Sequence, residues 1–216
     1  MYHLIAPAPP GAAYPQLYVP PQEFRTEMSW LAQRGYTAVT LQRVYDHWTR
    51  GVPLPSRPIV ISFDDGYLSQ YAEGFPTLRS HRWPGVLNLQ VAFLRTRFGM
   101  LPWRVRDLIA AGWEIDAHSI THPDLTKVDD AQLWNEVSGA RATLQWEFHI
   151  PVDFYCYPSG KYDARVIEAV RRAGFSGATT TNEGLARPPD YFTLPRIRVD
   201  ATDGVRGLAL KLRALR

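Results

Sequence analysis

One short stretch constrains the fold of this chain more than any other, because an apolar run in it ends abruptly in charge. Residues 59–63 (IVISF) are largely apolar and follow Pro58, which is typical of a buried strand. Asp64, Asp65 and Gly66 come next. Successive strand side chains point to opposite faces, so one carboxylate can hold a cation while the other serves proton transfer. An ordinary Asp-Gly turn after a strand has the same sequence. This stretch alone therefore does not decide between a functional carboxylate pair and a simple turn.

A histidine pair follows a second strand-like run. Residues 113–117 (WEIDA) precede His118 and His122, and Pro123 comes directly after them. Because proline disfavours the α conformation in the residue before it, we expect a single irregular turn that brings the two imidazoles together. Two imidazoles and a carboxylate are a common three-ligand set for catalytic zinc. The two motifs together favour a divalent metal site.

The rest of the chain alternates between strand-like and helix-like stretches. The patterns predict helices over 21–34, 41–50, 71–81, 104–111, 129–148, 163–173 and 205–215, and strands over 37–41, 86–94, 113–117, 153–157, 176–181 and 194–199. Residues 1–5 read as the tail of a strand, and Pro76 is expected to kink its helix or to mark a restart. Alternation of this kind indicates a parallel sheet or barrel but does not separate an open sheet from a closed one.

The segments Phe63-Asp64-Asp65-Gly66 and His118-Ser119-Ile120-Thr121-His122 resemble the first two motifs of a known family. That family is the polysaccharide deacetylases, the NodB-homology proteins of carbohydrate esterase family 4. The resemblance covers roughly residues 2–200. It implies the α/β class and a distorted (β/α) barrel with about seven parallel strands, whose site lies at the C-terminal strand ends.

The resemblance also implies roles for these residues. Asp65, His118 and His122 would bind the metal, and Asp64 would act as general base. Tyr157, Pro158 and Ser159 look like the third motif, where the Ser159 N–H is a candidate oxyanion donor. The family's motif arginine is absent there, and Arg196 could supply its orienting role, although a structural ion pair is the commoner role for such a residue.

The general acid is the least certain part of the site. Many family members carry it in a C-terminal Leu-x-His motif, but no histidine follows His149 in this chain. Residues 2–5 (YHLI) resemble instead the N-terminal segment of the circularly permuted exopolysaccharide and poly-N-acetylglucosamine deacetylase branch, as do residues 21–24 and 31–36. His3 is therefore the candidate acid, against the ordinary alternative of a disordered terminal histidine. His47, His81 and His149 are interpreted as structural.

Composition bounds the remaining choices. The 216 residues suit one catalytic domain over 1–216, and the net charge of +3 without a dense basic tract does not favour nucleic acid as a partner. The single cysteine, Cys156, excludes an intrachain disulfide and is expected in the core.

No apolar run approaches the length of a membrane span. No signal peptide is visible, whereas the resemblance implies an extracellular or cell-surface location. The oligomeric state is left open.

The functional expectation is a metal-dependent hydrolase acting on carbon–nitrogen bonds other than peptide bonds. Its substrate would be an N-acetylated amino-sugar polysaccharide such as poly-N-acetylglucosamine, peptidoglycan or a chitin-like polymer. Zinc is the expected metal, and cobalt or nickel would also suit these ligands. Two alternatives stay open, namely a carbohydrate-binding module on the same fold that has lost turnover, and an esterase for O-acetyl groups on polysaccharides.

Overall fold

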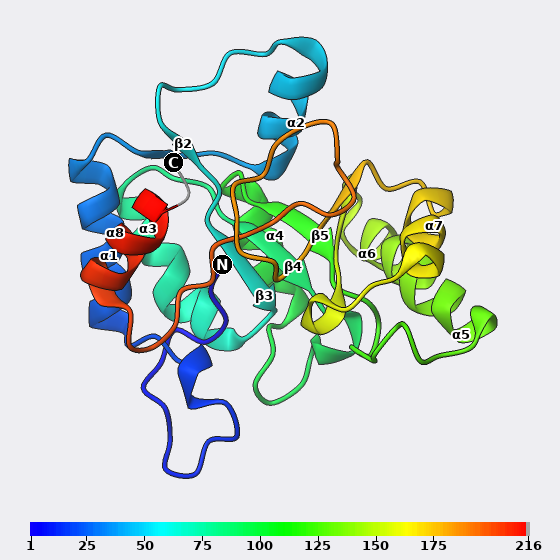
Figure 1. The fold of residues 1–216 in the computed structure, drawn as a ribbon. Helices are drawn as coiled ribbons and strands as arrows, with labels where there is room; N and C mark the ends of the chain where they lie inside the picture. Colours follow the sequence, from blue (N-terminus) through cyan, green and yellow to red (C-terminus); the bar gives the residue numbers. More distant parts are fainter. Residues whose placement is uncertain (215–216) are drawn as a thin grey trace.

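The computed structural model describes residues 1–214 and is organised around a five-stranded parallel sheet (Figure 1). Its strands lie side by side in chain order: β3 (Ser62–Asp65), β4 (Val86–Leu89), β5 (Glu114–Ala117), β6 (Phe154–Cys156) and β7 (Gly177–Thr179). Parallel pairing sends the C-terminal ends of all five strands to the same edge. Both sequence motifs are therefore delivered to one end of the sheet.

Two short segments extend this sheet beyond both of its edges. Tyr2 forms a parallel bridge with Phe63 of β3, and Leu194 forms one with Thr179 of β7. The N–H of Val199 donates to the carbonyl of Met1 at 3.1 Å, which joins the two flanking segments. These bonds connect the β3 edge of the sheet to the β7 edge. The predicted distorted α/β barrel is confirmed. The predicted strand over 194–199 is reduced to a single bridge.

The run before the two aspartates is divided between two sheets. Pro58–Ile59 form β2, which pairs with β1 (Thr37–Ala38) in a separate two-stranded parallel sheet. β3 begins only at Ser62 and includes both aspartates. The predicted single strand over 59–63 is therefore wrong in its bounds, because the chain changes its pairing partner between Ile59 and Ser62.

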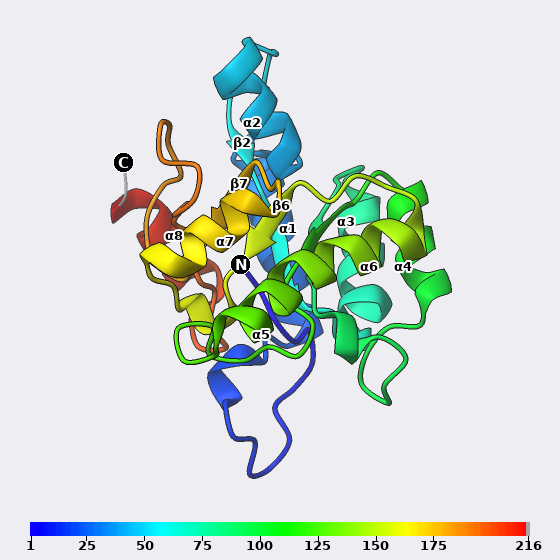
Figure 2. The same cartoon turned by 90° about the vertical axis from the view of Figure 1, so that its right-hand side faces the viewer.

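Helices cover the outside of the barrel (Figures 1 and 2). They are α1 (Pro21–Gln33), α2 (Leu41–Arg50), α3 (Phe75–Ser80), α4 (Pro102–Ala110), α5 (Asp130–Trp134), α6 (Ala140–Phe148), α7 (Ala164–Arg172) and α8 (Gly204–Ala214). The side chains of Thr40, Asp129 and Asp163 cap α2, α5 and α7 by accepting backbone N–H groups, which removes orphan donors at these helix starts. The last predicted helix matches α8, and its Leu215 lies outside the described residues.

Two π-helical turns modify the predicted helices. Gln70–Gly74 leads into α3, and Asn135–Gly139 joins α5 to α6, so the predicted helix over 129–148 is one continuous run with a π turn inside it. Pro76 is the second residue of α3, which directly follows the π turn, so the helical run continues through it with a changed hydrogen-bond pattern. The predicted strand over 86–94 ends at Leu89, and a 3-10 turn (Val91–Phe93) follows. Further 3-10 turns lie at Pro15–Leu17 and Pro158–Gly160.

The two faces of β3 carry different chemistry. Phe63 is fully buried and packs against rings on the helical side, at 5.2 Å from Trp113, 5.8 Å from Phe24 and 6.0 Å from Tyr2 between centroids. The next residue, Asp64, points to the opposite face, into the barrel. Alternation along one short strand therefore anchors the core and presents a carboxylate to the interior.

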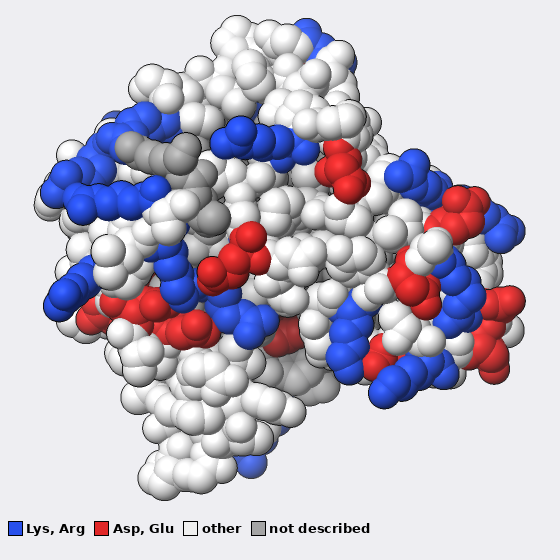
Figure 3. All heavy atoms as spheres, viewed as in Figure 1, with Lys and Arg blue, Asp and Glu red and all other residues white. Residues whose placement is uncertain are grey.

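The surface carries charge of both signs. Acidic and basic side chains alternate over α5 and α7 at the right of Figure 3, whereas the loop over residues 6–20, at the bottom, has no charged side chain. Within residues 1–214, no helix is both long and apolar enough to cross a bilayer.

Candidate active site

Asp65 and the histidine pair converge at the C-terminal ends of β3 and β5. Asp65 Oδ1 lies 3.4 Å from Nε2 of His118 and 3.7 Å from Nε2 of His122. Asp65 has a φ of 75° and Gly66 a φ of 98°, so the chain turns sharply as the strand ends. The backbone conformation therefore favours glycine, and a Cβ there would also lie 2.4 Å from Cδ1 of Leu89.

The turn between the histidines is irregular, as the sequence predicts. Ser119 and His122 adopt φ values of 62° and 61°, which non-glycine residues rarely do. Ser119 Oγ accepts the N–H of His122 at 2.8 Å. The buried carboxylate of Glu136 accepts the N–H groups of Ile120 and Thr121, both at 2.8 Å. These charge-assisted bonds fix the unusual backbone that brings His122 beside His118.

These three residues fit a divalent metal. In a tetrahedral zinc site with bonds of ~2.0–2.2 Å, ligand atoms lie about 3.3–3.6 Å apart, and the two separations from Asp65 are close to that spacing. The Nδ1 of His118 lies 2.8 Å from the carbonyl oxygen of Cys156. Donation from Nδ1 to that carbonyl leaves the Nε2 lone pair directed at the cluster, as metal-ligating histidines require.

Asp64 is held by a different set of groups. Arg196 donates from Nη1 to Oδ1 at 2.7 Å and from Nη2 to Oδ2 at 2.8 Å, and Asn88 donates to Oδ1 at 2.7 Å. The side chains of Asp64 and Arg196 are only 3% and 8% exposed. Arg196 itself is fixed by its Nε, which donates to the carbonyl of Thr180 at 2.8 Å. The forked pairing fixes the carboxylate plane as well as its charge.

The environment keeps Asp64 ionised. Burial alone would raise its pKa, but the charge and hydrogen bonds of Arg196, helped by His3 and His118, hold the pKa of Asp64 well below its usual value. The same pairing raises the pKa of Arg196 despite burial. Asp64 is therefore a carboxylate at neutral pH.

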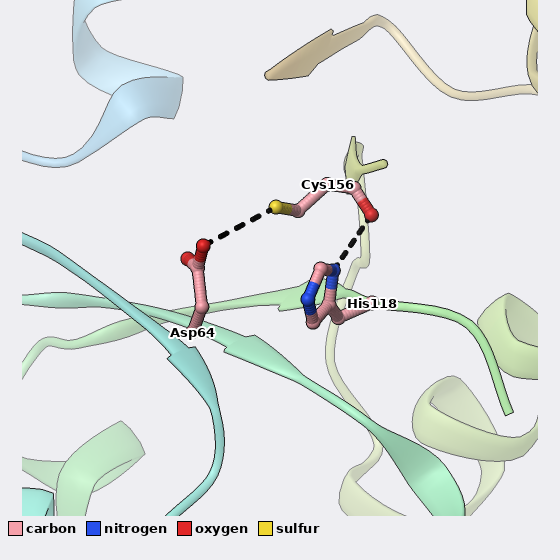
Figure 4. Close-up of side chains that lie close together, drawn as sticks. All are labelled: Asp64, His118 and Cys156. Atoms are coloured by element: carbon pink, nitrogen blue, oxygen red, sulfur yellow. Dashed lines mark hydrogen bonds between the residues drawn. The ribbon is translucent and has the colours of Figure 1, made fainter. Parts of the chain in front are cut away.

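Cys156 forms a second potential ligand group with Asp64 and His118, shown in Figure 4. Its Sγ lies 3.8 Å from Asp64 Oδ2 and 3.2 Å from Nη2 of Arg196. A metal ion there would lie beside a buried guanidinium, which like-charge repulsion disfavours. The cluster of Asp65, His118 and His122 is the better metal site. Cys156 is fully buried, as predicted for a core residue.

His3 lies beside Asp64. Its Nε2 is 3.8 Å from Asp64 Oδ2, and its side chain is 12% exposed. Gln70 donates from Nε2 to the carbonyls of both His3 (2.8 Å) and Asp64 (2.6 Å), which ties the N-terminal segment to β3. Burial lowers the pKa of His3, while the nearby carboxylates of Asp64 and Asp65 oppose that effect. His3 thus has a defined position next to Asp64, and its role as general acid stays a prediction.

Comparison with known protein families identifies the family of this chain. The family model described as polysaccharide deacetylase matches residues 51–178, more than half of the chain, and spans both motifs. The chain belongs to the polysaccharide deacetylase family.

Individual relatives agree with that assignment. YxkH of Bacillus subtilis, provisionally named a polysaccharide deacetylase, is 25% identical over 97% of this chain and 72% of its own length. The poly-β-1,6-N-acetyl-D-glucosamine N-deacetylase of Escherichia coli K12 is 39% identical, and the match covers 87% of this chain and 34% of that protein. The chain therefore spans about a third of that relative. The predicted resemblance to this branch is confirmed.

Solved structures confirm the fold. The deacetylase PplD of Streptococcus pyogenes, solved in complex with acetate, superposes with a TM-score of 0.89 at 20% identity over 97% of this chain and 95% of its own. At this identity the likeness concerns the fold alone. The barrel of this polysaccharide deacetylase is thus shared along nearly its whole length.

The third predicted motif lies after β6, next to the metal cluster in the strand order. Tyr157 is fully buried, and its hydroxyl donates to the carbonyl of Phe192 at 3.0 Å. Pro158 begins a 3-10 turn in which Ser159 adopts a φ of 53°. The turn follows Cys156, whose carbonyl contacts His118. The motif therefore borders the site, and its oxyanion role stays a prediction.

Sequence reasoning missed three residues that build this site: Asn88, Glu136 and Gln70. Asn88 has the clearest signal, because it is a polar residue inside the apolar run of β4 and pairs in register with Asp64. Glu136 and Gln70 lie in π turns, which are frequent at functional sites but leave no distinct letter pattern. Gln70 bonds the carbonyls of His3 and Asp64, and Glu136 bonds the turn at Ile120 and Thr121; both sets of bonds join different elements, which a linear pattern does not reveal.

Proposed function

We propose that this polysaccharide deacetylase is a metal-dependent hydrolase that removes acetyl groups from an N-acetylated amino-sugar polysaccharide. One observation carries the proposal. The three metal-ligand side chains converge at one end of the barrel, and directly beside them lies a buried carboxylate held by Arg196. With a divalent ion bound, that combination would place a Lewis acid beside a proton acceptor.

The ligand set supports zinc, with cobalt or nickel as substitutes. A divalent ion held by Asp65, His118 and His122 would polarise the acetyl carbonyl and acidify water. Asp65 supplies the one negative charge of the set, and its side chain is 15% exposed. The neutral imidazole of His122 is 29% exposed, so a substrate can approach from its side.

Asp64 would accept the proton of the attacking water. A carboxylate with a depressed pKa is a weak base, so this transfer depends on prior acidification of the water. Arg196 and Asn88 hold the carboxylate still, which fixes the direction from which it can take the proton. Arg196 would thus fill the orienting role of the absent motif arginine.

His3 would protonate the amine as it leaves. Its Nε2 lies close to Asp64 Oδ2, so a proton taken by Asp64 can be relayed over a short path. An amide nitrogen leaves poorly unless it is protonated, so such an acid matters for N-acetyl substrates. The Ser159 N–H, with Tyr157 and Pro158 shaping the same wall, would stabilise the oxyanion.

The names of the relatives support a proposal for the substrate class. Poly-N-acetylglucosamine is the first candidate, with peptidoglycan and chitin-like polymers as further ones. Such polymers lie outside the cytoplasm, so we place the protein at an extracellular or cell-surface location. We propose that residues 1–216 form one catalytic domain, since the larger of two core clusters extends from Tyr2 to Leu212.

A binding module without turnover is the less favoured alternative. An absent orienting arginine and an exposed His3 would motivate it, but Arg196 reaches Asp64 and His3 is largely buried. Acetate release from a β-1,6-N-acetylglucosamine oligomer and from an O-acetylated xylan tests the proposal. We expect release from the oligomer, and binding without release would favour the module. Release from the xylan alone would favour the O-acetyl esterase.

A matched pair of variants separates the two aspartates in the same assay. Asp65→Ala should lose metal and activity together, while Asp64→Asn should keep its metal and turn over about 10²–10⁴-fold more slowly. A metal-loaded Asp65→Ala variant would remove Asp65 from the ligand set.

A further inference from the structure

The buried guanidinium of Arg196 needs an acceptor for every N–H, and a guanidinium carries five of them. Its Nε donates to the carbonyl of Thr180, and Nη1 and Nη2 each donate to one oxygen of Asp64. Nη1 also donates to Ser62 Oγ, at the longer distance of 3.5 Å. The remaining acceptor for Nη2 among the described residues is Sγ of Cys156, at 3.2 Å. The thiol therefore completes the hydrogen bonding of this arginine.

The same sulfur also contacts the carboxylate that the arginine holds (Figure 4). Sγ of Cys156 lies 3.8 Å from Asp64 Oδ2, so the thiol accepts from Arg196 and donates its own hydrogen to Asp64. Cys156 is fully buried on β6, so bulk water does not compete for either contact. The thiol thus bridges both members of the ion pair.

The two oxygens of Asp64 have different surroundings. Oδ1 accepts two strong hydrogen bonds, from Arg196 and from Asn88, both at 2.7 Å. Oδ2 accepts one strong bond, from Arg196 at 2.8 Å, and lies 3.8 Å from Nε2 of His3. A thiol is only a weak donor, so Oδ2 keeps a lone pair for the proton of the attacking water. Cys156 therefore lies beside the oxygen that would take this proton.

The backbone of Cys156 serves the other half of the site. Its carbonyl oxygen lies 2.8 Å from Nδ1 of His118, whose Nε2 faces Asp65 in the metal cluster. A side-chain substitution at Cys156 leaves that carbonyl in place. The contribution of the thiol can therefore be measured at constant metal content.

We propose that Cys156 is a positioning residue for the general base: its thiol holds the guanidinium of Arg196 in the plane that directs Asp64 Oδ2 at the attacking water. The assignment rests on the proposed deacetylase function, since only a reacting carboxylate needs a fixed direction. Loss of the sulfur leaves one N–H of a buried cation without an acceptor, and the guanidinium then turns out of the forked geometry to find one. The loss should appear in turnover and not in metal or substrate binding.

Acetate release from the β-1,6-N-acetylglucosamine oligomer by Cys156→Ala and Cys156→Ser tests this assignment. Both substitutions reduce the side-chain volume, but only Cys156→Ser keeps an acceptor for Arg196. We expect Cys156→Ala to lower kcat by about fivefold or more with KM and zinc content unchanged, and Cys156→Ser to recover most of that loss. A role in packing alone predicts equal losses in the two variants, and equal kcat values would overturn the assignment.

Two further variants exclude an effect of volume. Cys156→Val fills the space without providing an acceptor, so its kcat should fall as in Cys156→Ala. Thr179→Val is the matched control, because Thr179 is the register partner of Cys156 on β7 and its hydroxyl has no hydrogen-bond partner among the described residues. We expect no change in kcat for this control. Wild-type kcat in Cys156→Val would contradict the assignment.

A double-variant cycle shows whether the thiol acts through Arg196. In the Arg196→Lys background the forked pair is already absent, so Cys156→Ala should lower kcat by less than about twofold further. Fully additive losses would mean that Cys156 acts on the site by another route and would contradict the assignment.

A measurement without turnover separates this positioning from the proposed function. The Nη protons of Arg196 should give resolved NMR signals in arginine-labelled wild type, because buried, hydrogen-bonded N–H groups exchange slowly with solvent. Cys156→Ala should broaden these signals, and Cys156→Ser should keep them. Wild type that shows the signals but releases no acetate would refute the deacetylase function. Signals that are unchanged in Cys156→Ala would refute the positioning role, whatever the activity.

Discussion

Arg196 is the residue on which the geometry of the general base depends. Lysine cannot make the forked pair, because it has one nitrogen where arginine presents two. We expect Arg196→Lys to slow acetate release by about tenfold or more at unchanged zinc content, since orientation and not metal binding is lost. Arg198→Lys, two residues later on the same segment, is the matched control. Wild-type turnover in Arg196→Lys would remove Arg196 from the mechanism.

His3 gives a prediction that depends on the leaving group. His3→Ala should slow deacetylation of the amide substrate by about 10²-fold, because the amine must be protonated as it leaves. An activated aryl acetate needs no such proton and should lose much less activity. His81→Ala, which changes a histidine at the end of α3, is the control. Equal losses on both substrates would assign His3 to structure or binding.

At the scale of single elements, the turn after β5 depends on a carboxylate from another element. Glu136→Gln keeps the shape but removes the charge that holds the N–H groups of Ile120 and Thr121. We expect the zinc dissociation constant, measured by competition with a chelator, to rise by roughly 10–100-fold, as is typical when the groups that orient metal ligands are changed. Glu168→Gln on the exposed side of α7 is the control. An unchanged constant would show that the turn holds without Glu136.

The elements show which parts of the fold a sequence can specify. The alternation of strands and helices and the two motifs follow from local patterns, because apolar periodicity and Asp-Gly or His-Pro dipeptides act over a few residues. The bounds of β2 and β3 do not, because they depend on which strand is available for pairing. The same limit applies to the pairing of Asp64 with Arg196, which are 132 residues apart. The sequence offered Arg196 only as a candidate.

At the scale of the whole molecule, a buried acid ties the N-terminal segment to α1. Glu27 is fully buried and accepts the hydroxyl of Tyr2 at 2.9 Å, and burial raises the pKa of Glu27 to about 7. The folded state therefore binds this proton more tightly than the unfolded chain. Glu27 contributes stability below its unfolded pKa, and that contribution is lost as the pH rises towards 7.

Glu27→Gln should remove this dependence. Between pH 5 and pH 8 the wild-type free energy of unfolding should fall relative to that of the variant by roughly 2–3 kcal/mol, since one unit of pKa shift corresponds to about 1.4 kcal/mol. Urea denaturation at the two pH values measures the difference, and Glu23→Gln serves as control. Parallel pH dependence in wild type and Glu27→Gln would mean that Glu27 titrates normally in the folded state.

The central claim is that Asp65, His118 and His122 hold a divalent ion that acetate release requires. The most direct test strips the protein with a chelator, removes the chelator, and follows acetate release from the β-1,6-N-acetylglucosamine oligomer as zinc is added back. We predict that release stops after stripping and returns in full at about one equivalent of zinc, because the three side chains form one site. Release that continues at the original rate from the stripped, metal-free protein would contradict the account.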